Sequence, residues 1–130
     1  MSDPESEVLA AAAGVVAAYG AHDVERYFAS FEPGATFLFH TTPELLPSRA
    51  AYLAEWGSWE AAGFHVLSCE SRDQRVQLLA EGIAVFTHSV ATRLRDADGE
   101  HDLSERETIV FRRAADGRWL GLHEHLSPAP

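Results

Sequence analysis

Lysine is absent from this sequence of 130 residues, so all ten basic side chains are arginines, set against 20 acidic ones for a formal charge of −10. No basic cluster is available to neutralise phosphates, and we expect no nucleic-acid partner. An acidic small molecule is not excluded, because one buried arginine can bind a carboxylate even in an acidic protein.

Cysteine is nearly absent too, since Cys69 is the only one. A single thiol excludes an internal disulfide and a cysteine-based zinc site. The neighbours of Cys69 alternate as in a strand, which indicates a buried and inert thiol.

Long apolar runs are also missing, because none approaches the roughly 18 residues that a membrane-spanning helix needs. The apolar stretch from Val8 to Tyr19 follows acidic residues, the reverse of the basic start of a signal peptide. We therefore expect a cytoplasmic protein without a membrane partner. There is no glycine-rich phosphate loop, Gly-x-Ser-x-Gly elbow or dinucleotide fingerprint, and the leading interpretation includes neither a cofactor nor a metal.

Helix signals occur in the first half of the chain. Asp3, Asp23 and Ser48 each precede an apolar pattern of helical period and predict the N-caps of three helices. The expected ends are Gly20, a turn at Pro33-Gly34, and Gly63. A strand is expected over residues 35–40, between the second and third helices.

Strand signals follow from Phe64 onward. Residues 64–71 and 75–79 read as strands separated by a polar interruption, and residues 83–94, 105–111 and 119–127 read as three more. An Asp-Gly turn at residues 116–117 joins the last two as a hairpin. This order predicts an α+β domain with a curved, mostly antiparallel sheet wrapped against about three N-terminal helices. We expect one domain over residues 1–130, with its core at about 6–127.

The closing hairpin carries the most suggestive chemistry. Regular alternation along its second strand puts Trp119, His123 and His125 on one face and Glu124 on the other. A neutral imidazole is a competent acid or base near pH 7. His123 and His125 are therefore expected as catalytic pocket groups, with His40 as a third.

A histidine-ligated metal is the alternative reading of the same residues. His123 and His125, two positions apart, would need a third ligand such as His40 or His88 to hold zinc, iron or copper. Without a metal, His88 is expected to assist in binding the substrate.

Other candidate binding residues are an arginine and several aromatic side chains. Arg106, if it points into a pocket, needs an anion as partner, either a substrate carboxylate or an internal acid. Aromatic side chains offer flat walls and hydroxyl donors to an apolar or polycyclic ligand; the candidates are Tyr19, Tyr27, Tyr52 and Trp56.

The order of these elements, with the C-terminal pattern Arg106-x-Thr108, Asp116-Gly117-x-Trp119 and His123-x-His125-x-Ser127, resembles the nuclear transport factor 2-like superfamily. Within it, SnoaL-like and ketosteroid-isomerase-like proteins are most similar, alongside the association domain of calcium/calmodulin-dependent kinase. The resemblance implies a cone-shaped fold with a pocket at its open end, and dimers formed through the sheet. It does not fix the activity, because this scaffold serves both enzymes and assembly modules.

The ketosteroid isomerase segment Ala-Ala-Leu-Asn-Ala-Gly-Asp is similar to residues 17–23 here. Extending that alignment puts the isomerase's catalytic tyrosine at Val15 and its general-base aspartate at Phe39. Neither side chain can transfer a proton, so the isomerase machinery is not expected in this chain.

The function expected from the sequence is binding of a small, apolar or polycyclic organic molecule. The reaction expected on the bound molecule is acid–base chemistry without a cofactor, such as isomerisation, cyclisation or dehydration. The alternative is a non-catalytic dimeric ligand-binding or assembly module. A homodimer through the sheet is expected in either case.

Overall fold

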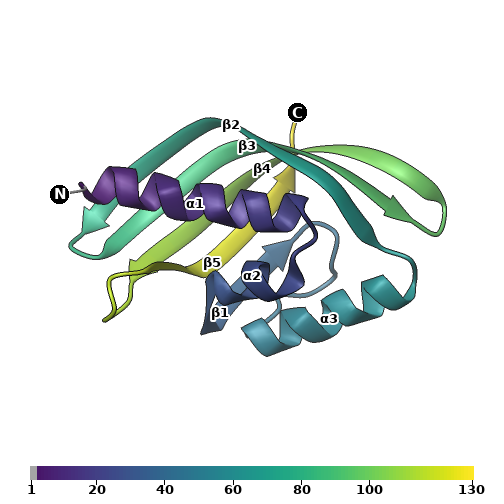
Figure 1. Cartoon of the computed structure of the whole chain (residues 1–130), viewed down its shortest axis with the longest axis horizontal. Helices are drawn as coiled ribbons and strands as arrows, with labels where there is room; N and C mark the ends of the chain where they lie inside the picture. The colour runs from purple at the N-terminus through teal and green to yellow at the C-terminus, as the bar shows by residue number, and fades with distance from the viewer. Residues whose placement is uncertain (1–2) are drawn as a thin grey trace.

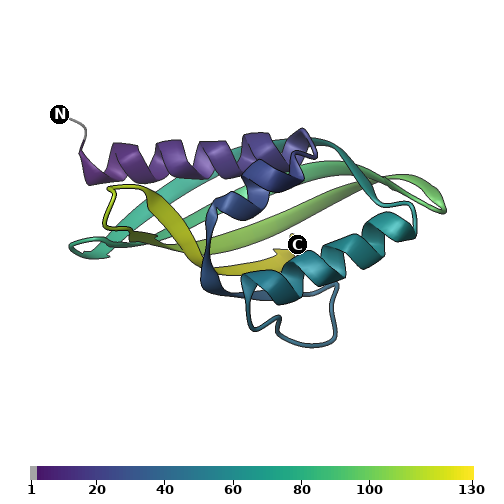
Figure 2. The same cartoon turned by 60° about the horizontal axis from the view of Figure 1, so that its bottom comes forward.

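Three helices lie against one face of a five-stranded sheet (Figure 1). The computed structural model describes residues 3–130. Helix α1 (Pro4–Gly20) runs along the sheet, while the short α2 (Val24–Ala29) and α3 (Arg49–Ala61) lie beside the strand β1 (Phe31–Phe39), as Figure 2 shows from a second direction. The result is the curved α+β cone expected from the sequence.

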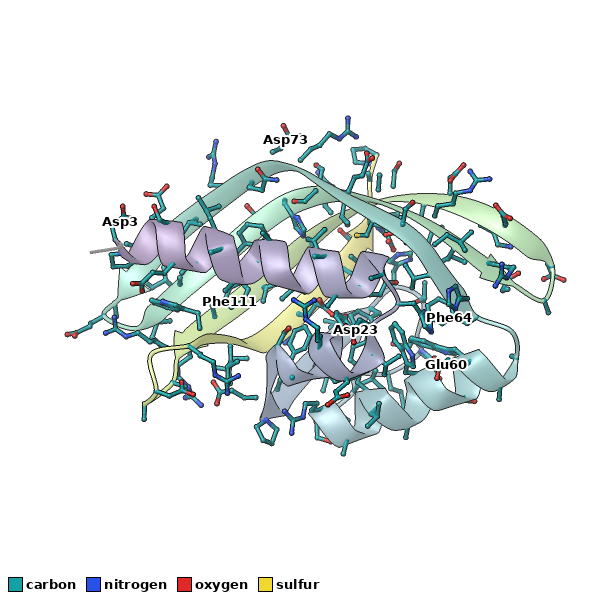
Figure 3. All side chains as sticks on the ribbon, in the orientation of Figure 1. Asp3, Asp23, Glu60, Phe64, Asp73 and Phe111 are labelled. Carbon is teal, nitrogen blue, oxygen red and sulfur yellow. The ribbon has the colours of Figure 1, made fainter. Side chains whose placement is uncertain are left out.

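Local capping explains where the helices begin. Side-chain oxygens of Asp3, Asp23 and Ser48 accept hydrogen bonds from the backbone N–H three residues later, at 2.8, 3.2 and 3.0 Å (Figure 3 labels Asp3 and Asp23). These bonds satisfy donors that a helix leaves free at its first turn, and they confirm all three predicted caps. No helix among residues 3–130 is both long and apolar enough to cross a membrane.

Three long strands and two shorter ones form the sheet in the order β1-β5-β4-β3-β2. The strands β2 (His65–Ala80), β3 (Ile83–Asp96), β4 (Gly99–Arg113) and β5 (Trp119–Pro128) pair antiparallel in that succession. Strand β1 pairs parallel with β5. The β1–β5 pair brings the end of the chain next to the segment that follows α2.

Two boundaries differ from the sequence prediction. The second helix ends at Ala29. Pro33-Gly34 does not form the expected turn but lies inside β1, at a shift in the register of the pairing with β5. The polar residues 72–74 do not break the next strand, because β2 continues through them with a bulge. Asp73 adopts a φ of 55° there and lies at the edge of the sheet away from the helices (Figure 3).

The inner face of the sheet, which contacts the helices, holds the core. Phe86 on β3 and Ile109 and Phe111 on β4 are fully buried there, together with Phe31 at the start of β1. Because strand side chains alternate between faces, the same inner face also receives the side chains two and four positions before Ile109. These are Glu107 and Glu105.

Strand β5 contains one residue more than its partner β4 near the middle of their ladder. Phe111 pairs with Gly121 whereas Val110 pairs with His123, which leaves Leu122 without a partner. A bulge of this kind transfers every later side chain to the opposite face from the one that regular alternation predicts.

The bulge therefore corrects the expected orientation of the closing strand. Trp119 and Glu124 are both buried against the helices, although regular alternation separates them. His123 and His125 point to the outer face of the sheet instead. The prediction that these two histidines face the interior of the cone is wrong for this reason.

Candidate active site

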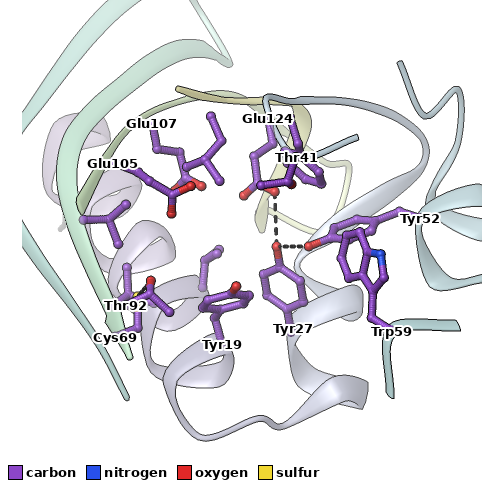
Figure 4. Close-up of a pocket in the computed structure, with 15 residues that line it drawn as sticks. Tyr19, Tyr27, Thr41, Tyr52, Trp59, Cys69, Thr92, Glu105, Glu107 and Glu124 are labelled. Carbon is purple, nitrogen blue, oxygen red and sulfur yellow. Dashed lines mark hydrogen bonds between the residues drawn. The ribbon is translucent and has the colours of Figure 1, made fainter. Parts of the chain in front are cut away.

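A cavity of about 70 Å³ lies between the inner face of the sheet and the helices (Figure 4). Every helix and every strand contributes at least one side chain to its wall. The wall is apolar and aromatic on the helical side and acidic on the sheet side; it consists of Val15, Val16, Tyr19, Tyr27, Phe39, Thr41, Tyr52, Trp59, Cys69, Val90, Thr92, Glu105, Glu107, Glu124 and Leu126.

The cavity continues into a larger groove of about 410 Å³ at the end of the sheet where β3 turns into β4. Tyr19, Thr41, Trp59, Glu105 and Leu126 border both spaces. The rest of the groove is largely apolar; it is completed by Ala62, Phe64, Leu94, Asp96, His101 and Leu103. The site thus consists of a small inner chamber and a wider apolar mouth.

Three glutamates form the sheet side of the inner chamber. Glu105 and Glu107 are two residues apart on β4. Glu124 lies on β5 opposite Ile109, which is the next inward-facing residue of β4 after Glu107. Glu105 and Glu124 are 5% and 2% exposed, which is unusual because acidic side chains are rarely buried without partners.

Two tyrosines hold the deepest of these carboxyls. The hydroxyl of Tyr27 donates to Oε1 of Glu124 at 3.1 Å and lies 2.9 Å from the hydroxyl of Tyr52 (Figure 4). Burial raises the pKa of both phenols well above the ordinary value, and the charge of Glu124 raises it further. Tyr27 and Tyr52 are therefore neutral hydrogen-bonding groups throughout the physiological range.

Glu107 and Glu124 form a coupled pair. Burial raises the pKa of Glu107 to about 7, while a hydrogen bond from Glu124 acts in the opposite direction. Burial also raises the pKa of Glu124 well above its ordinary value, and the charge and hydrogen bond of Glu107 raise it further. The pair therefore exchanges a proton near pH 7, and Glu124 holds its proton more tightly than an ordinary glutamate does.

His88 supports this pair from behind the cavity wall. Its Nε2 lies 2.7 Å from Oε1 of Glu107 and its Nδ1 lies 2.5 Å from Oγ of Ser71 on β2. Burial lowers the pKa of His88 to about 4, against a smaller upward effect of Glu124. His88 is thus a neutral imidazole at pH 7 and contacts the carboxyl pair through Glu107.

His40 has the same relation to the other inner carboxyl. Its Nε2 lies 2.5 Å from Oε2 of Glu105, with the imidazole at the exposed end of β1. The structure therefore places His40 outside the cavity wall, in contact with a carboxyl that lines it.

The aromatic candidates are placed largely as expected. Tyr19, Tyr27 and Tyr52 all line the inner chamber. Trp56 is 1% exposed and does not reach the chamber, because it packs edge-on among Tyr19, Phe28 and Phe64. The prediction that Trp56 contacts a substrate is therefore wrong, because its side chain lies in the core.

Arg106 and the two hairpin histidines lie on the far side of the sheet. Arg106 and His125 border a separate hollow of about 390 Å³ on the outer face. His123 is hydrogen-bonded to Thr36 at 2.8 Å on that face. The expectation that these three side chains line the pocket is wrong. Arg106 points outward because it lies between the inward-pointing Glu105 and Glu107. The two histidines point outward because they come after the bulge in β5.

Sequence reasoning missed all three glutamates. A signal for two of them was present, because Glu105 and Glu107 share the strand face of Ile109 and Phe111, the larger apolar residues of β4. No local signal marked Glu124, whose inward position depends on the bulge at Leu122.

The structure does not bring together the histidines that the alternative of a histidine-ligated metal requires. His88 is on the inner face while His123 and His125 are on the outer one, so no third histidine reaches the pair. Over residues 3–130, no group of three or more His, Cys, Asp or Glu side chains is arranged to hold a metal ion.

Val15 and Phe39, where the catalytic tyrosine and aspartate of ketosteroid isomerase would align, both line the chamber. Both side chains at these two positions are apolar. The polar groups come instead from β4, β5 and the tyrosines of the helices.

Comparison with solved structures supports this fold. A ketosteroid isomerase-like protein from Erwinia carotovora atroseptica SCRI1043 has a TM-score of 0.83 at 15% identity, with all of both chains covered. A putative calcium/calmodulin dependent protein kinase II association domain from Xanthomonas campestris has a TM-score of 0.78 at 23% identity, over 98% of this chain and 90% of the other.

An NTF2-like protein of unknown function in nutrient uptake from Rhodospirillum rubrum ATCC 11170 has a TM-score of 0.81 at 16% identity, covering 95% of this chain and 98% of the other. No protein of curated function matches the sequence. Residues 8–130 match the SnoaL-like domain. With nearly the whole length matched and the nuclear transport factor 2-like fold shared, the chain belongs to the family of SnoaL-like domains.

Proposed function

We propose that this chain binds a small organic molecule in its cavity and moves a proton with the Glu107–Glu124 pair. It would act as a cofactor-independent isomerase, cyclase or dehydratase. The observation that carries the proposal is the position of Glu107 and Glu124 together in the cavity wall, where burial raises the pKa of Glu107 to about 7 and that of Glu124 well above its ordinary value. A general base works best when its pKa lies near the operating pH.

The roles of the two carboxyls follow from their environments. Ionised Glu107 faces the chamber and accepts a proton from a C–H or O–H group of the ligand. The protonated Glu107 then returns that proton to another atom of the ligand, and the hydrogen bond between Glu107 and Glu124 stabilises the ionised form of Glu107. The hydroxyl of Tyr19 also lines the chamber and makes no hydrogen bond to another described residue, so it is free to donate to a ligand oxygen that gains negative charge.

The lining indicates the class of ligand. No arginine is among the residues that border the chamber or the mouth, whereas Glu105, Glu107 and Glu124 all do. An anionic ligand would be repelled, so the polar end of the ligand is neutral or cationic. The inner chamber takes this polar end, and the mouth between Trp59, Phe64 and Leu103 takes an apolar body.

The experiment combines a titration with an exchange assay. Carbon-13 NMR of glutamate-labelled protein should show one carboxyl titrating near pH 7 that disappears in Glu107→Gln. A panel of neutral, cationic and anionic apolar molecules is then screened by thermal shift. Each binder is incubated with the protein in D2O, and deuterium incorporation at its acidic carbon is measured.

The matched control is Glu70→Gln, an exposed glutamate on the outer side of β2. We expect binders to retain affinity in Glu107→Gln while deuterium incorporation falls by roughly 100-fold, and Glu70→Gln to behave as wild type. Equal deuterium incorporation in wild type and Glu107→Gln would refute the catalytic role.

A non-catalytic binding or assembly module is the second candidate, and the size of the inner chamber favours it. A volume of about 70 Å³ holds only a few water molecules or a small group of atoms. Under this alternative, ligands bind in the mouth and no deuterium enters them. The same exchange assay therefore separates the two functions.

We also propose a homodimer formed through the outer face of the sheet. No helix of the described residues 3–130 covers that face (Figures 1 and 2), and its central side chains, among them Thr87, Thr108 and Val110, are only half-buried in the single chain. Light scattering should give twice the mass of 14.2 kDa, and Thr108→Glu, which puts a charge at the centre of this face, should give the monomer. A wild-type monomer would refute the dimer.

A further inference from the structure

A row of hydrogen bonds runs from the exposed edge strand β2 across β3 to Glu107 on β4. Nε2 of Gln74 lies 3.0 Å from Oγ of Ser71, and that oxygen lies 2.5 Å from Nδ1 of His88. Nε2 of His88 lies 2.7 Å from Oε1 of Glu107. Gln74 is exposed and Ser71 half-buried, so the row begins at the protein surface.

The direction of each bond can be assigned from the groups involved. Gln74 also bonds the backbone carbonyl of Ser71 at 3.1 Å, and a carbonyl only accepts, so its amide nitrogen is the donor to Ser71. The hydroxyl hydrogen of Ser71 is then free to donate to Nδ1 of His88. The imidazole consequently carries its hydrogen on Nε2 and donates it to Glu107.

The other bonds of the carboxyl pair do not reach solvent. They lead from Glu124 to Tyr27 and Tyr52, which are both 3% exposed and end inside the chamber. From the chamber, Glu107 reaches solvent through the mouth, which a bound ligand would fill; Glu107 and His88 are also among the residues that border the hollow on the outer face. None of Gln74, Ser71 or His88 borders that mouth.

We propose that Ser71 and His88 are positioning residues that exchange the proton of Glu107 with solvent from the edge of the sheet, independently of the mouth. This inference rests on the proposed role of Glu107. In the inward direction, the Nε2 proton of His88 moves to Glu107, the hydroxyl proton of Ser71 moves to Nδ1, and a hydronium ion at the surface replaces the Ser71 proton. The outward direction reverses each transfer and restores the first tautomer.

The surroundings of His88 suit a neutral relay. The groups that face its ring are Ser71 from β2, Glu107 from β4 and the ring of Phe86 on its own strand, at 4.6 Å between centroids, with Glu124 nearby. No cation faces it. A ring that stays neutral passes protons by changing tautomer and needs no buried charge.

The test measures the His88 ring by NMR in histidine-labelled, ligand-free protein. Nitrogen-15 shifts report which ring nitrogen carries hydrogen, and line shapes report how fast the Nε2 hydrogen exchanges with water. Ser71→Ala removes the hydroxyl, Ser71→Thr retains one, and Ser89→Ala is the control on the outer face of β3. Thermal unfolding of each variant confirms that it folds.

We expect hydrogen on Nε2 in the wild type, exchange slowed by roughly 100-fold in Ser71→Ala, recovery in Ser71→Thr, and wild-type exchange in Ser89→Ala. Hydrogen on Nδ1, or unchanged exchange in Ser71→Ala, would overturn the relay. If Glu107 still titrates near its pKa of about 7 in those samples, the proposed function stands without the relay. If Glu107 titrates at its ordinary value of 4.5, the proposed function itself fails.

Discussion

The hydroxyl of Tyr27 lies 3.1 Å from Oε1 of Glu124, so the shortest helix holds the most deeply buried carboxyl of the sheet. The two residues are 97 positions apart in the chain. Because Tyr27 also meets the hydroxyl of Tyr52 at 2.9 Å, α2, α3 and β5 are joined at one polar point inside an aromatic core.

Tyr27→Phe should destabilise the fold by about 1–3 kcal/mol, because it leaves the buried oxygens of Glu124 and Tyr52 with fewer partners. Tyr19→Phe is the matched control, since the Tyr19 hydroxyl bonds no other described residue, and it should cost less than about 0.5 kcal/mol. Urea unfolding at pH 7 measures both. Equal losses in the two variants would show that the Tyr27 bond contributes nothing specific.

Glu107→Gln should become more stable relative to wild type as pH rises from 4.5 to about 7. The folded-state pKa of Glu107 is raised to about 7, so the folded protein binds more protons than the unfolded chain in this window and loses stability as pH rises. The relative gain should approach about 3 kcal/mol. Unfolding free energies measured across this range, with Glu70→Gln as control, check the sign; a constant difference would contradict the raised pKa.

His88 should show the opposite dependence. Its folded-state pKa is lowered to about 4, so the unfolded chain binds more protons between pH 4 and 6.5, and the folded state loses stability as pH falls through that window. His88→Gln should therefore lose stability at pH 7 but gain relative to wild type on acidification. A variant whose deficit grows at low pH would show that His88 is charged in the folded protein.

Cys69 should react slowly with thiol reagents. It lines the cavity, and burial raises the pKa of its thiol to about 11, against a weak hydrogen bond from Thr92. Alkylation by iodoacetamide at pH 8 should be on the order of 100-fold slower than for a free cysteine, because the thiolate is the reactive form. Ligands that fill the chamber should slow it further, and a rate equal to that of free cysteine would contradict this environment.

Gly121→Ala should destabilise the protein by about 1–3 kcal/mol through overpacking. A Cβ at this position would lie 2.5 Å from the ring of Phe31, which is itself fully buried. Gly14→Ala is the control, because a Cβ there meets nothing within 4 Å and a helical Gly→Ala change stabilises by roughly 0.5–1 kcal/mol. Thermal unfolding of both should therefore show shifts of opposite sign.

The parts of the fold that depend on neighbouring residues could be predicted from the sequence. Helix starts at Asp3, Asp23 and Ser48 are set by a side chain and a backbone N–H three residues away, and such signals are local. The order of the strands and the α+β class follow from periodicity. The tyrosines of the cavity wall could be anticipated because they lie on helix faces whose direction is known once the apolar stripe is found.

The acidic side of the site could not be predicted in the same way. Charged side chains ordinarily lie in solvent, whereas Glu105 and Glu107 lie in the cavity wall. Hydrogen bonds to His40 and His88, which come from other parts of the fold, stabilise them there. The inward position of Glu124 depends on where β4 and β5 lose register. Pairing between strands determines that position, and no short window of sequence contains it.

The unpaired Leu122 has a consequence for how this domain can diversify. A single inserted or deleted residue at that point exchanges the glutamate-bearing and histidine-bearing faces of the last strand. The chemistry offered to a ligand can thus change from carboxylate to imidazole without any substitution of the groups themselves. In this chain, strand length is as much a determinant of reactivity as the identity of the side chains.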